Sequence, residues 1–277
     1  MKDRELFFTD LDNTLIYSHR HDFGVPRIWV EELNGKKQSF MTGRSYAFFQ
    51  SQSWLDVIPV TTRTRRQYER LQPAFRLLGW RDALVCNGAF LLHDGREDRS
   101  WTEESLKLAE KARPAFLKLL EFSKSTMGEE AVAAEEPFLF YIKAAEKADK
   151  VFQMLREQAD LSQVQILRDS RKVYCFPKPL DKGTAVRRYM SRSRKKSCMA
   201  AGDSEFDLPM LARADICFYP PGLQEGIGRL RDPEGSAADG LLQIFGNEKK
   251  ICAGVFADEI CNILEKRSEE EDLDREC

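Results

Sequence analysis

The stretch that decides the fold lies early in the printed sequence and reads Phe7-Phe8-Thr9-Asp10-Leu11-Asp12-Asn13-Thr14-Leu15. It opens on a short apolar run, which predicts a buried strand. Asp10 and Asp12 follow one residue apart, at the carboxyl end of that strand, where parallel sheets bind their ligands. There Asp10 is placed to act as a nucleophile, while Asp12 exchanges a proton with the leaving group and then with water. Short acidic strings also form turns and helix caps, so the pair alone leaves both interpretations open.

A second acidic string, Gly202-Asp203-Ser204-Glu205-Phe206-Asp207, also follows a run of small and apolar residues, Cys198-Met199-Ala200-Ala201. Two such strand ends that lie side by side can share one cation. Carboxylate oxygens of Asp10 and Asp203, with the carbonyl of Asp12 and water, would supply the octahedral oxygen shell that Mg²⁺ requires. We therefore expect Mg²⁺ as a cofactor, which would also shield Asp10 from an incoming phosphate. This requires the oxygens of residues 10 and 203 to lie within about 8 Å of each other.

Together with three further strings, these two elements resemble the haloacid dehalogenase (HAD) superfamily. Within it, the closest resemblance is to the Cof-type and sucrose-phosphatase-like sugar phosphatases, which carry a large cap inserted midway through the core. The first string matches the pattern DxDxT and the last matches GDxxxD. Between them, in the order that the family has, stand Val60-Thr61-Thr62-Arg63, Cys86-Asn87-Gly88-Ala89 and Asp181-Lys182-Gly183. The five elements span the whole chain.

The resemblance implies a Mg²⁺-dependent phosphomonoester hydrolase that forms an aspartyl-phosphate intermediate. Its substrate would be a small phosphorylated metabolite, with a sugar phosphate as the commonest case in the family. The residues expected in catalysis are Asp10, Asp12, Thr61 and Lys182, and those expected at the metal are Asp10, Asp12, Asp203 and Asp207. For the substrate and its phosphate we expect Leu11, Thr62, Arg63, Asn87 and Arg44, with Tyr174 as a further candidate for gripping the leaving group.

Lys182 is also notable without the resemblance, because lysine at a helix start is unfavourable for the helix dipole. That cost is understandable if the ammonium faces anions. Two departures from the family pattern concern the phosphate side of the site. Phe206 stands where the Cof pattern usually has Asn, and Thr62 stands where the family has Gly, so the space beside the phosphate would be narrower.

Thr42-Gly43-Arg44 matches the family's Thr-Gly-Arg more literally than Thr61-Thr62-Arg63 does. The context favours the later string, because 55–60 reads as a strand that leads into the sheet, whereas 36–39 is polar.

Three other functions share parts of this pattern. A phosphomutase would use Asp10 and Asp12 in the same way but would return the phosphoryl group to the substrate. A non-catalytic phosphate-ligand-binding homologue is compatible with the fold, although such a protein would be expected to have lost at least one catalytic residue. A dehalogenase would need neither Asp12 nor the metal cluster.

The composition agrees with a small-molecule enzyme. The chain has 277 residues, which suggests two domains, and its net charge of −2 gives no electrostatic case for binding nucleic acid or an anionic membrane. Its seven cysteines are an odd number without a pairing pattern, which favours reduced thiols and a cytoplasmic location. No apolar stretch is long enough to span a membrane, no signal-peptide apolar region follows the first residues, and no protein partner is expected.

The expected fold is α/β, with a Rossmann-like, doubly wound parallel-sheet core and an inserted α+β cap. Residues 1–88 and 177–264 would form the discontinuous core, 89–176 the cap, and 265–277 a charged, disordered tail. Asn34-Gly35 predicts a hairpin that acts as a flap over the site. The cap is expected as four antiparallel strands with two helices on one face. Its predicted elements are strands at 91–95, 138–142, 164–167 and 172–176, a helix that begins at Thr102 and buries Leu108 to Leu120, and a helix around 148–155.

Overall fold

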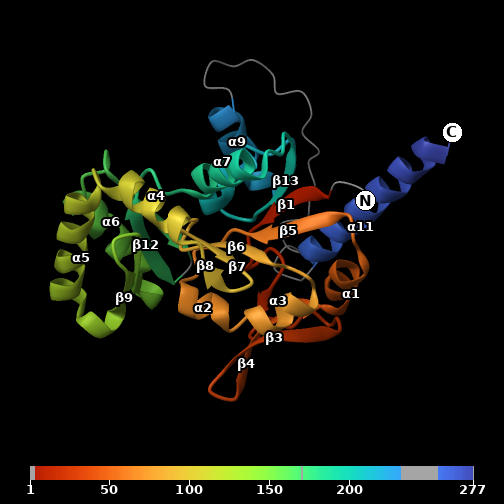
Figure 1. Ribbon diagram of the computed structural model, residues 1–277. Coiled ribbons are helices and arrows are strands. Elements are labelled where there is room, and N and C mark those ends of the chain that lie inside the picture. Colours follow the sequence, from red (N-terminus) through yellow and green to blue (C-terminus); the bar gives the residue numbers. More distant parts are fainter. Residues whose placement is uncertain (1–3, 170, 232–254, 277) are drawn as a thin grey trace.

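A four-stranded parallel sheet forms the core of this mixed α/β protein (Figure 1). The computed structural model describes residues 4–169, 171–231 and 255–276. In spatial order the strands of the parallel sheet are β14 (Ile216–Phe218), β13 (Cys198–Ala201), β1 (Glu5–Thr9) and β5 (Leu55–Pro59). All three pairings between them are parallel. The predicted α/β class with a parallel-sheet core is confirmed.

The register of this sheet brings the two acidic strings together. Thr9 of β1 pairs with Ala201 of β13, and the amide of Asp10 donates to the carbonyl of Ala201 at 2.8 Å. Because parallel strands end on the same side of a sheet, the segments that follow β1 and β13 leave it at one edge. Residues nearly 200 positions apart in the sequence thereby share one site.

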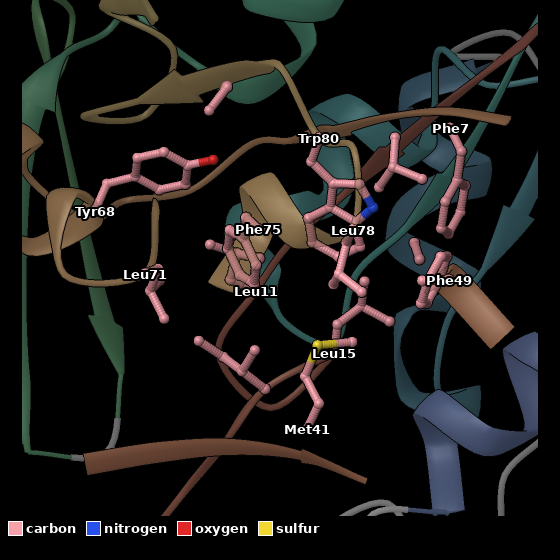
Figure 2. Close-up of a cluster of buried hydrophobic side chains, with 14 of the residues drawn as sticks. Phe7, Leu11, Leu15, Met41, Phe49, Tyr68, Leu71, Phe75, Leu78 and Trp80 are labelled. Carbon is pink, nitrogen blue, oxygen red and sulfur yellow. The ribbon is translucent and has the colours of Figure 1, made fainter. Parts of the chain in front are cut away.

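Helices cover both faces of the sheet. Successive residues of a strand point to opposite faces, so Phe7 joins one apolar cluster while Leu6 and Phe8 join the other. Figure 2 shows part of the first cluster, where Phe7 stacks against Phe49. That face is covered by α1 (Gly43–Ser51), α2 (Arg65–Glu69), α3 (Gln72–Leu77) and α11 (Val255–Glu276). The opposite face is covered by α4 (Arg99–Ala109), α7 (Lys182–Ser193), α8 (Leu208–Leu211) and α9 (Gln224–Arg231).

A second, three-stranded sheet extends the core from the end of β5. It consists of β6 (Asp82–Val85), β7 (Phe90–His93) and β8 (Arg96–Glu97). Val60 forms a parallel bridge with Leu84, which links β6 to the core. The chain then turns through Cys86, Asn87 and Gly88, all with positive φ, and β7 runs back antiparallel to β6. The run at 91–95, predicted as a cap strand, therefore belongs to this hairpin.

The predicted flap is a hairpin next to the first strand. β3 (Arg27–Leu33) and β4 (Lys36–Thr42) pair antiparallel, with the two-residue β2 (Tyr17–Ser18) on the other side of β4. Asn34 and Gly35 form the turn with φ values of 52° and 72°. These positive angles are why Asn-Gly is the preferred pair in such turns.

A four-stranded antiparallel sheet, here called the insert sheet, lies between β8 and α7 in the sequence. Its strands in spatial order are β11 (Val164–Asp169), β12 (Lys172–Pro177), β10 (Leu139–Lys143) and β9 (Val132–Glu135). Helices α5 (Arg113–Met127) and α6 (Ala148–Gln158) pack on one of its faces through a separate apolar cluster that contains Phe116, Phe140 and Leu155. The short 3₁₀ helices are η1 (Glu129–Ala131), η2 (Ala145–Lys147), η3 (Glu205–Asp207) and η4 (Pro221–Leu223).

Two helix boundaries differ from those expected. The helix expected to begin at Thr102 begins at Arg99, because Asp98 caps it by accepting a hydrogen bond from the amide of Trp101 at 3.0 Å. The single helix expected through Leu120 is two helices, α4 and α5, with a proline in the first turn of α5. Proline favours a helix start, since it lacks the amide that a continuing helix would need.

The last described helix, α11, packs behind the flap. The amide of Ala257 donates to the Tyr17 hydroxyl at 3.2 Å, and the Thr42 hydroxyl donates to Asp258. The helix continues to Glu276, through the segment that the sequence suggested as a disordered tail. In the described part of the chain, no helix combines the length and apolarity that crossing a membrane requires.

Candidate active site

Lys182 lies between two carboxylates at the carboxyl edge of the parallel sheet. It is the first residue of α7, whose capping residue Asp181 accepts a hydrogen bond from the amide of Thr184 at 2.6 Å. Lys182 Nζ donates to Asp10 Oδ1 at 2.6 Å and to Asp207 Oδ1 at 2.5 Å, and its side chain is only 1% exposed. A buried ammonium requires such partners. The two anions thus offset the unfavourable position of a lysine at a helix start.

Asp203 forms a cluster of three carboxylates with Asp10 and Asp207. One oxygen of each residue lies within 4.8 Å of the other two. Thr14 Oγ1 donates to Asp203 Oδ1 at 3.0 Å, which fixes this side chain from the loop after β1. The separation of the oxygens of residues 10 and 203 is therefore well within the limit of about 8 Å that a shared cation allows.

Negative charge exceeds positive charge inside this cluster. Burial, followed by the charges of Asp207 and Asp12, raises the pKa of Asp10 to about 7, although Lys182 acts in the opposite direction. Burial and the neighbouring carboxylates also raise the pKa of Asp203. A divalent cation with oxygen ligands would offset this repulsion. The carboxylates of Asp10, Asp203 and Asp207 could therefore hold a metal ion.

Both carboxylate oxygens of Asp207 have partners within the protein. Its Oδ1 binds Lys182, while its Oδ2 accepts hydrogen bonds of 3.0 Å from the amides of Asp203 and Ser204 and from the Ser204 hydroxyl. Gly202 must lack a side chain here, because a Cβ would lie 2.3 Å from Cβ of Asp207. In this structure Asp207 holds Lys182 and the loop of Asp203 in place.

Arg63 holds the second carboxylate of the first string. Its Nε donates to Asp12 Oδ2 and its Nη2 to Asp12 Oδ1, both at 2.7 Å, which is a bidentate ion pair. Burial alone would raise the pKa of Asp12, but the Arg63 guanidinium outweighs it and holds the pKa below its usual value. Asp12 therefore carries its negative charge in this arrangement.

Glu31, a residue of the flap, lies behind Arg63 and was not expected in the site. Its side chain is 2% exposed, and Oε1 lies 3.0 Å from Arg63 Nη1 and 2.7 Å from Arg70 Nη2. The Ser39 hydroxyl donates to Glu31 Oε2 at 2.6 Å. These partners, Arg63 above all, hold the pKa of Glu31 below its usual value despite its burial. Arg63 thus bridges two carboxylates, one from the flap and one at the site.

The loop after β5 places the threonines predicted near the phosphate. Thr61 is buried, and its hydroxyl accepts a hydrogen bond from the amide of Arg63 at 3.1 Å. Thr62 lines the pocket and hydrogen-bonds Tyr174. The side chain of Leu11 lies in the apolar core, so any contact that it makes with a phosphate would use its backbone amide.

Two predicted substrate residues have other partners. Asn87 is buried and donates through Nδ2 to the carbonyl of Leu180 at 2.8 Å, which ties the turn after β6 to the segment before α7. Arg44 pairs with Glu265 and Asn262 of α11. The structure therefore does not bring Arg44 to the acidic cluster, since the literal Thr-Gly-Arg string serves as the start of α1.

The acidic cluster opens into a cavity of about 500 Å³. Its walls come from the loops of the core, the flap and the turn between β11 and β12. The lining residues that the sequence pattern did not single out for this site include Ser18, Gln38, Glu31, Gln67, Arg70, Asp169, Arg171 and Lys172. They lie on loops, on strands and, for Gln67, in α2, and their positions depend on tertiary packing, which explains why local spacing gave no signal for them.

The insert sheet contacts the core beside this cavity. Phe206 packs edge-on against Tyr174, with ring centroids 5.3 Å apart, and also contacts Phe176. Gln67 Nε2 donates to the Tyr141 hydroxyl at 3.1 Å. Phe206, which departs from the Cof pattern, therefore takes part in an aromatic contact between the core and the insert sheet.

Comparison with known proteins gives matches at the level of structure. No family model matches the sequence, and no curated protein matches it. The sucrose-phosphatase from Synechocystis sp. PCC6803 in complex with sucrose and phosphate is 15% identical, with a TM-score of 0.54 over 92% of this chain and 96% of that chain. A haloacid dehalogenase-like hydrolase from Bacteroides thetaiotaomicron is 13% identical, with a TM-score of 0.53 over 93% of this chain and 100% of that one.

A HAD subclass IIB sugar phosphatase gives a TM-score of 0.50 at 15% identity, over 86% of this chain and 93% of that chain. The matches thus extend over both the parallel-sheet core and the insert sheet. The chain has the fold of the HAD superfamily phosphatases, as the order of its five sequence elements indicated.

Proposed function

We propose that this protein is a Mg²⁺-dependent phosphomonoester hydrolase that acts on a small phosphorylated metabolite through an aspartyl-phosphate intermediate. The observation that carries the proposal is the position of Lys182 Nζ, 2.6 Å from Asp10 Oδ1 and 2.5 Å from Asp207 Oδ1, beside the carboxylate of Asp203. A buried cation against a carboxylate at the end of a strand is suited to hold a nucleophile and the oxygens of a phosphoryl group together.

In the first step, an oxygen of Asp10 attacks phosphorus, and the bond between phosphorus and the ester oxygen breaks. Asp12, which Arg63 holds charged in this structure, must first take up a proton and then donates it to the departing alcohol. Lys182 and the amides after Asp10 stabilise the charge on the phosphoryl oxygens. Mg²⁺, held by Asp10 and Asp203, would reduce the repulsion between the nucleophile and the phosphate dianion.

In the second step, Asp12 removes a proton from water as the water attacks the aspartyl phosphate, which releases inorganic phosphate and restores Asp10. Asp12 must therefore alternate between its neutral and charged forms. Glu31 assists this change, because Arg63 can remain paired with Glu31 when Asp12 takes up a proton.

The insert sheet and its helices would act as the cap that limits water at the site during the first step. The sequence pattern divides the chain into a core of 1–88 and 177–264 and a cap of 89–176; because β7, β8 and α4 pack with the core, we propose that the cap begins at α5 and ends at 176. The cavity volume, about 500 Å³, falls in the range of roughly 300 to 1,000 Å³ that is common for small-molecule sites. Buried thiols at Cys86, Cys175 and Cys261, outside any disulfide, support a reducing compartment such as the cytoplasm.

Release of inorganic phosphate from a panel of phosphorylated metabolites, measured with Mg²⁺ and with excess EDTA, tests the proposal. Asp10→Asn should abolish metal-dependent release, whereas the control Asp56→Asn, on the protein surface beside Arg4, should retain it. Phosphate release by Asp10→Asn at the parental rate would refute the assigned nucleophile. Transfer to a second sugar position without accumulation of phosphate would identify a phosphomutase.

A further inference from the structure

The cavity beside the acidic cluster is lined by many basic side chains. The basic and titratable side chains that line the cavity are His19, Arg20, His21, Arg63, Arg70, Arg171, Lys172 and Lys182. Lys182 is paired with the acidic cluster, and both Arg63 and Arg70 are paired with Glu31. Arg20 and Arg171 are exposed at the rim. Lys172 differs from both groups, because it is partly buried and yet has no such carboxylate.

Lys172 is the first residue of β12 and lies against two aromatic rings of the insert sheet. Its Nζ is 5.0 Å from the centroid of the Tyr141 ring and 6.0 Å from that of Tyr174. Within the described residues, no carboxylate lies within 4.0 Å of this ammonium; Asp169, which pairs with Lys172 across β11 and β12, attracts it from a greater distance. The aromatic faces stabilise the charge but do not accept its hydrogen bonds in the way that an anion does.

The charges around Lys172 show which way it faces. Asp12 and Asp169 attract it, while Arg63 and Lys143 repel it. Burial is the main reason that the pKa of Lys172 lies below its usual value, and Lys172 in turn helps to lower the pKa of Asp12. Lys172 is therefore within electrostatic reach of Asp12, the group that would protonate the departing alcohol. Both residues line the same cavity.

We propose that Lys172 binds a second anionic group on the alcohol part of the substrate, so that this protein prefers phosphomonoesters whose leaving group carries a carboxylate or another phosphoryl group. This inference rests on the proposed function and names the substrate class for the same site. A sugar phosphate whose alcohol part is neutral would leave this partly buried ammonium without an anion at ion-pair distance. A ligand anion there would form a charge-assisted hydrogen bond in place of lost water.

The rim cations support the same preference. Arg20 and Arg171 line the same cavity as Lys172, at exposed positions. These two side chains add positive charge next to Lys172, which favours a substrate that bears more negative charge than a single phosphate.

Matched substrate pairs test this inference. Glycerol 3-phosphate and 3-phosphoglycerate differ by a carboxylate, and fructose 6-phosphate and fructose 1,6-bisphosphate differ by a phosphoryl group. We expect higher kcat/KM for an anionic member of at least one pair, and the pair that shows it identifies the kind of anion. Lys172→Met should lower kcat/KM for that substrate by about tenfold to a hundredfold, while changing it little for the neutral partner.

Lys143→Met is the matched control. Lys143 pairs with Lys172 across β10 and β12 but does not line the cavity. Removing its charge should leave the preference for the anionic substrate intact. A parent protein without such a preference, or an equal loss in both variants, would overturn the inference while leaving the hydrolase proposal in place.

A binding measurement separates this inference from the proposed function. Calorimetric titration of Asp10→Asn protein in Mg²⁺ compares the same pairs without turnover. Tighter binding of an anionic member, lost when Lys172→Met is added, supports the inference even if no substrate of the panel is hydrolysed. Equal affinities within both pairs, or no detectable binding, would count against it.

Discussion

Replacing Lys182 by methionine removes a buried positive charge and keeps most of the side-chain volume. In the parent protein, Nζ contacts Asp10 Oδ1 at 2.6 Å and Asp207 Oδ1 at 2.5 Å, and the side chain is 1% exposed. Removing one partner from a buried ion pair costs about 3–5 kcal/mol, because the other charge remains buried and unpaired. For a chain of this size, about 2 °C of Tm per kcal/mol converts this to a decrease of roughly 6–10 °C.

The loss should depend on pH and on Mg²⁺. Near pH 8, Asp10 and Asp203 tend to ionise, and the variant lacks the Lys182 ammonium that would offset their charge. The full decrease in Tm is therefore expected in EDTA. Near pH 5 the carboxylates of the variant can take up protons, because their pKa values are already raised in the parent protein. The decrease should be smaller there, and smaller again at pH 8 when Mg²⁺ replaces part of the missing positive charge.

Thermal unfolding followed by intrinsic fluorescence, with EDTA or Mg²⁺ at both pH values, measures these differences. The matched control is Lys178→Met, because Lys178 is exposed and its ammonium donates to a backbone carbonyl, that of Leu161, at 3.3 Å. Its Tm should stay close to that of the parent protein. A Lys182→Met protein as stable as the control at pH 8 in EDTA would refute the reasoning about the buried charge.

Three further predictions concern the surroundings of this cluster. Glu31→Gln leaves Arg63 with Asp12 as its only carboxylate partner among the described residues, so Asp12 should become harder to protonate. The alkaline limb of the pH profile of kcat should therefore move to lower pH. An unchanged limb would contradict the bridging role of Arg63. Phe206→Ala removes a buried ring from the contact with the insert sheet. This should lower the free energy of unfolding, measured with urea, by about 3 kcal/mol and raise KM. A variant as stable as the wild type would show that the contact matters little. The pKa of Asp10 is raised to about 7, so the folded state favours its neutral form. In the absence of metal, this form contributes stability that is lost as pH rises from about 4 through 7. The increase in Tm caused by Mg²⁺ should therefore be larger at pH 8 than at pH 5.5, which a fluorimetric titration can measure, and a pH-independent increase would argue against Asp10 as a ligand.

The core and the acidic site could be predicted because their signals are local. Continuous apolar runs precede Asp10 and Asp203, and such runs form strands that are buried on both faces of a parallel sheet. Asn34-Gly35 likewise predicted its hairpin, because few other pairs adopt two positive φ angles at low cost.

The sequence-based predictions were wrong where two local patterns were equally good and a contact with a distant part of the chain selected one of them. Asp98 and Thr102 are both good helix caps, and the burial of Trp101 against the core goes with the earlier start. The apolar run at 90–93 fits any sheet, and only the turn at Cys86 to Gly88 directs it back to β6. Local periodicity carries no information about either choice.

Functional residues on the flap were missed for a related reason. An acidic residue such as Glu31 in a hairpin strand usually faces solvent, and its burial here depends on Arg63 and Arg70 from a later part of the chain. Arg44 shows the opposite case, since it matches a family string literally but is occupied by Glu265. A motif indicates chemistry only when its strand context agrees.

The contacts of α11 have a consequence for synthesis on the ribosome. Ala257 and Asp258 bind Tyr17 in β2 and Thr42 at the end of β4, next to the hairpin that bears Glu31. A nascent chain can therefore pair its early strands long before these supports exist, but the pocket reaches its final shape only after residues 255–265 have emerged. Until then, newly made molecules would expose the apolar surface against which Phe256 and Ile260 pack. The last stage of translation is therefore the period of greatest risk of aggregation.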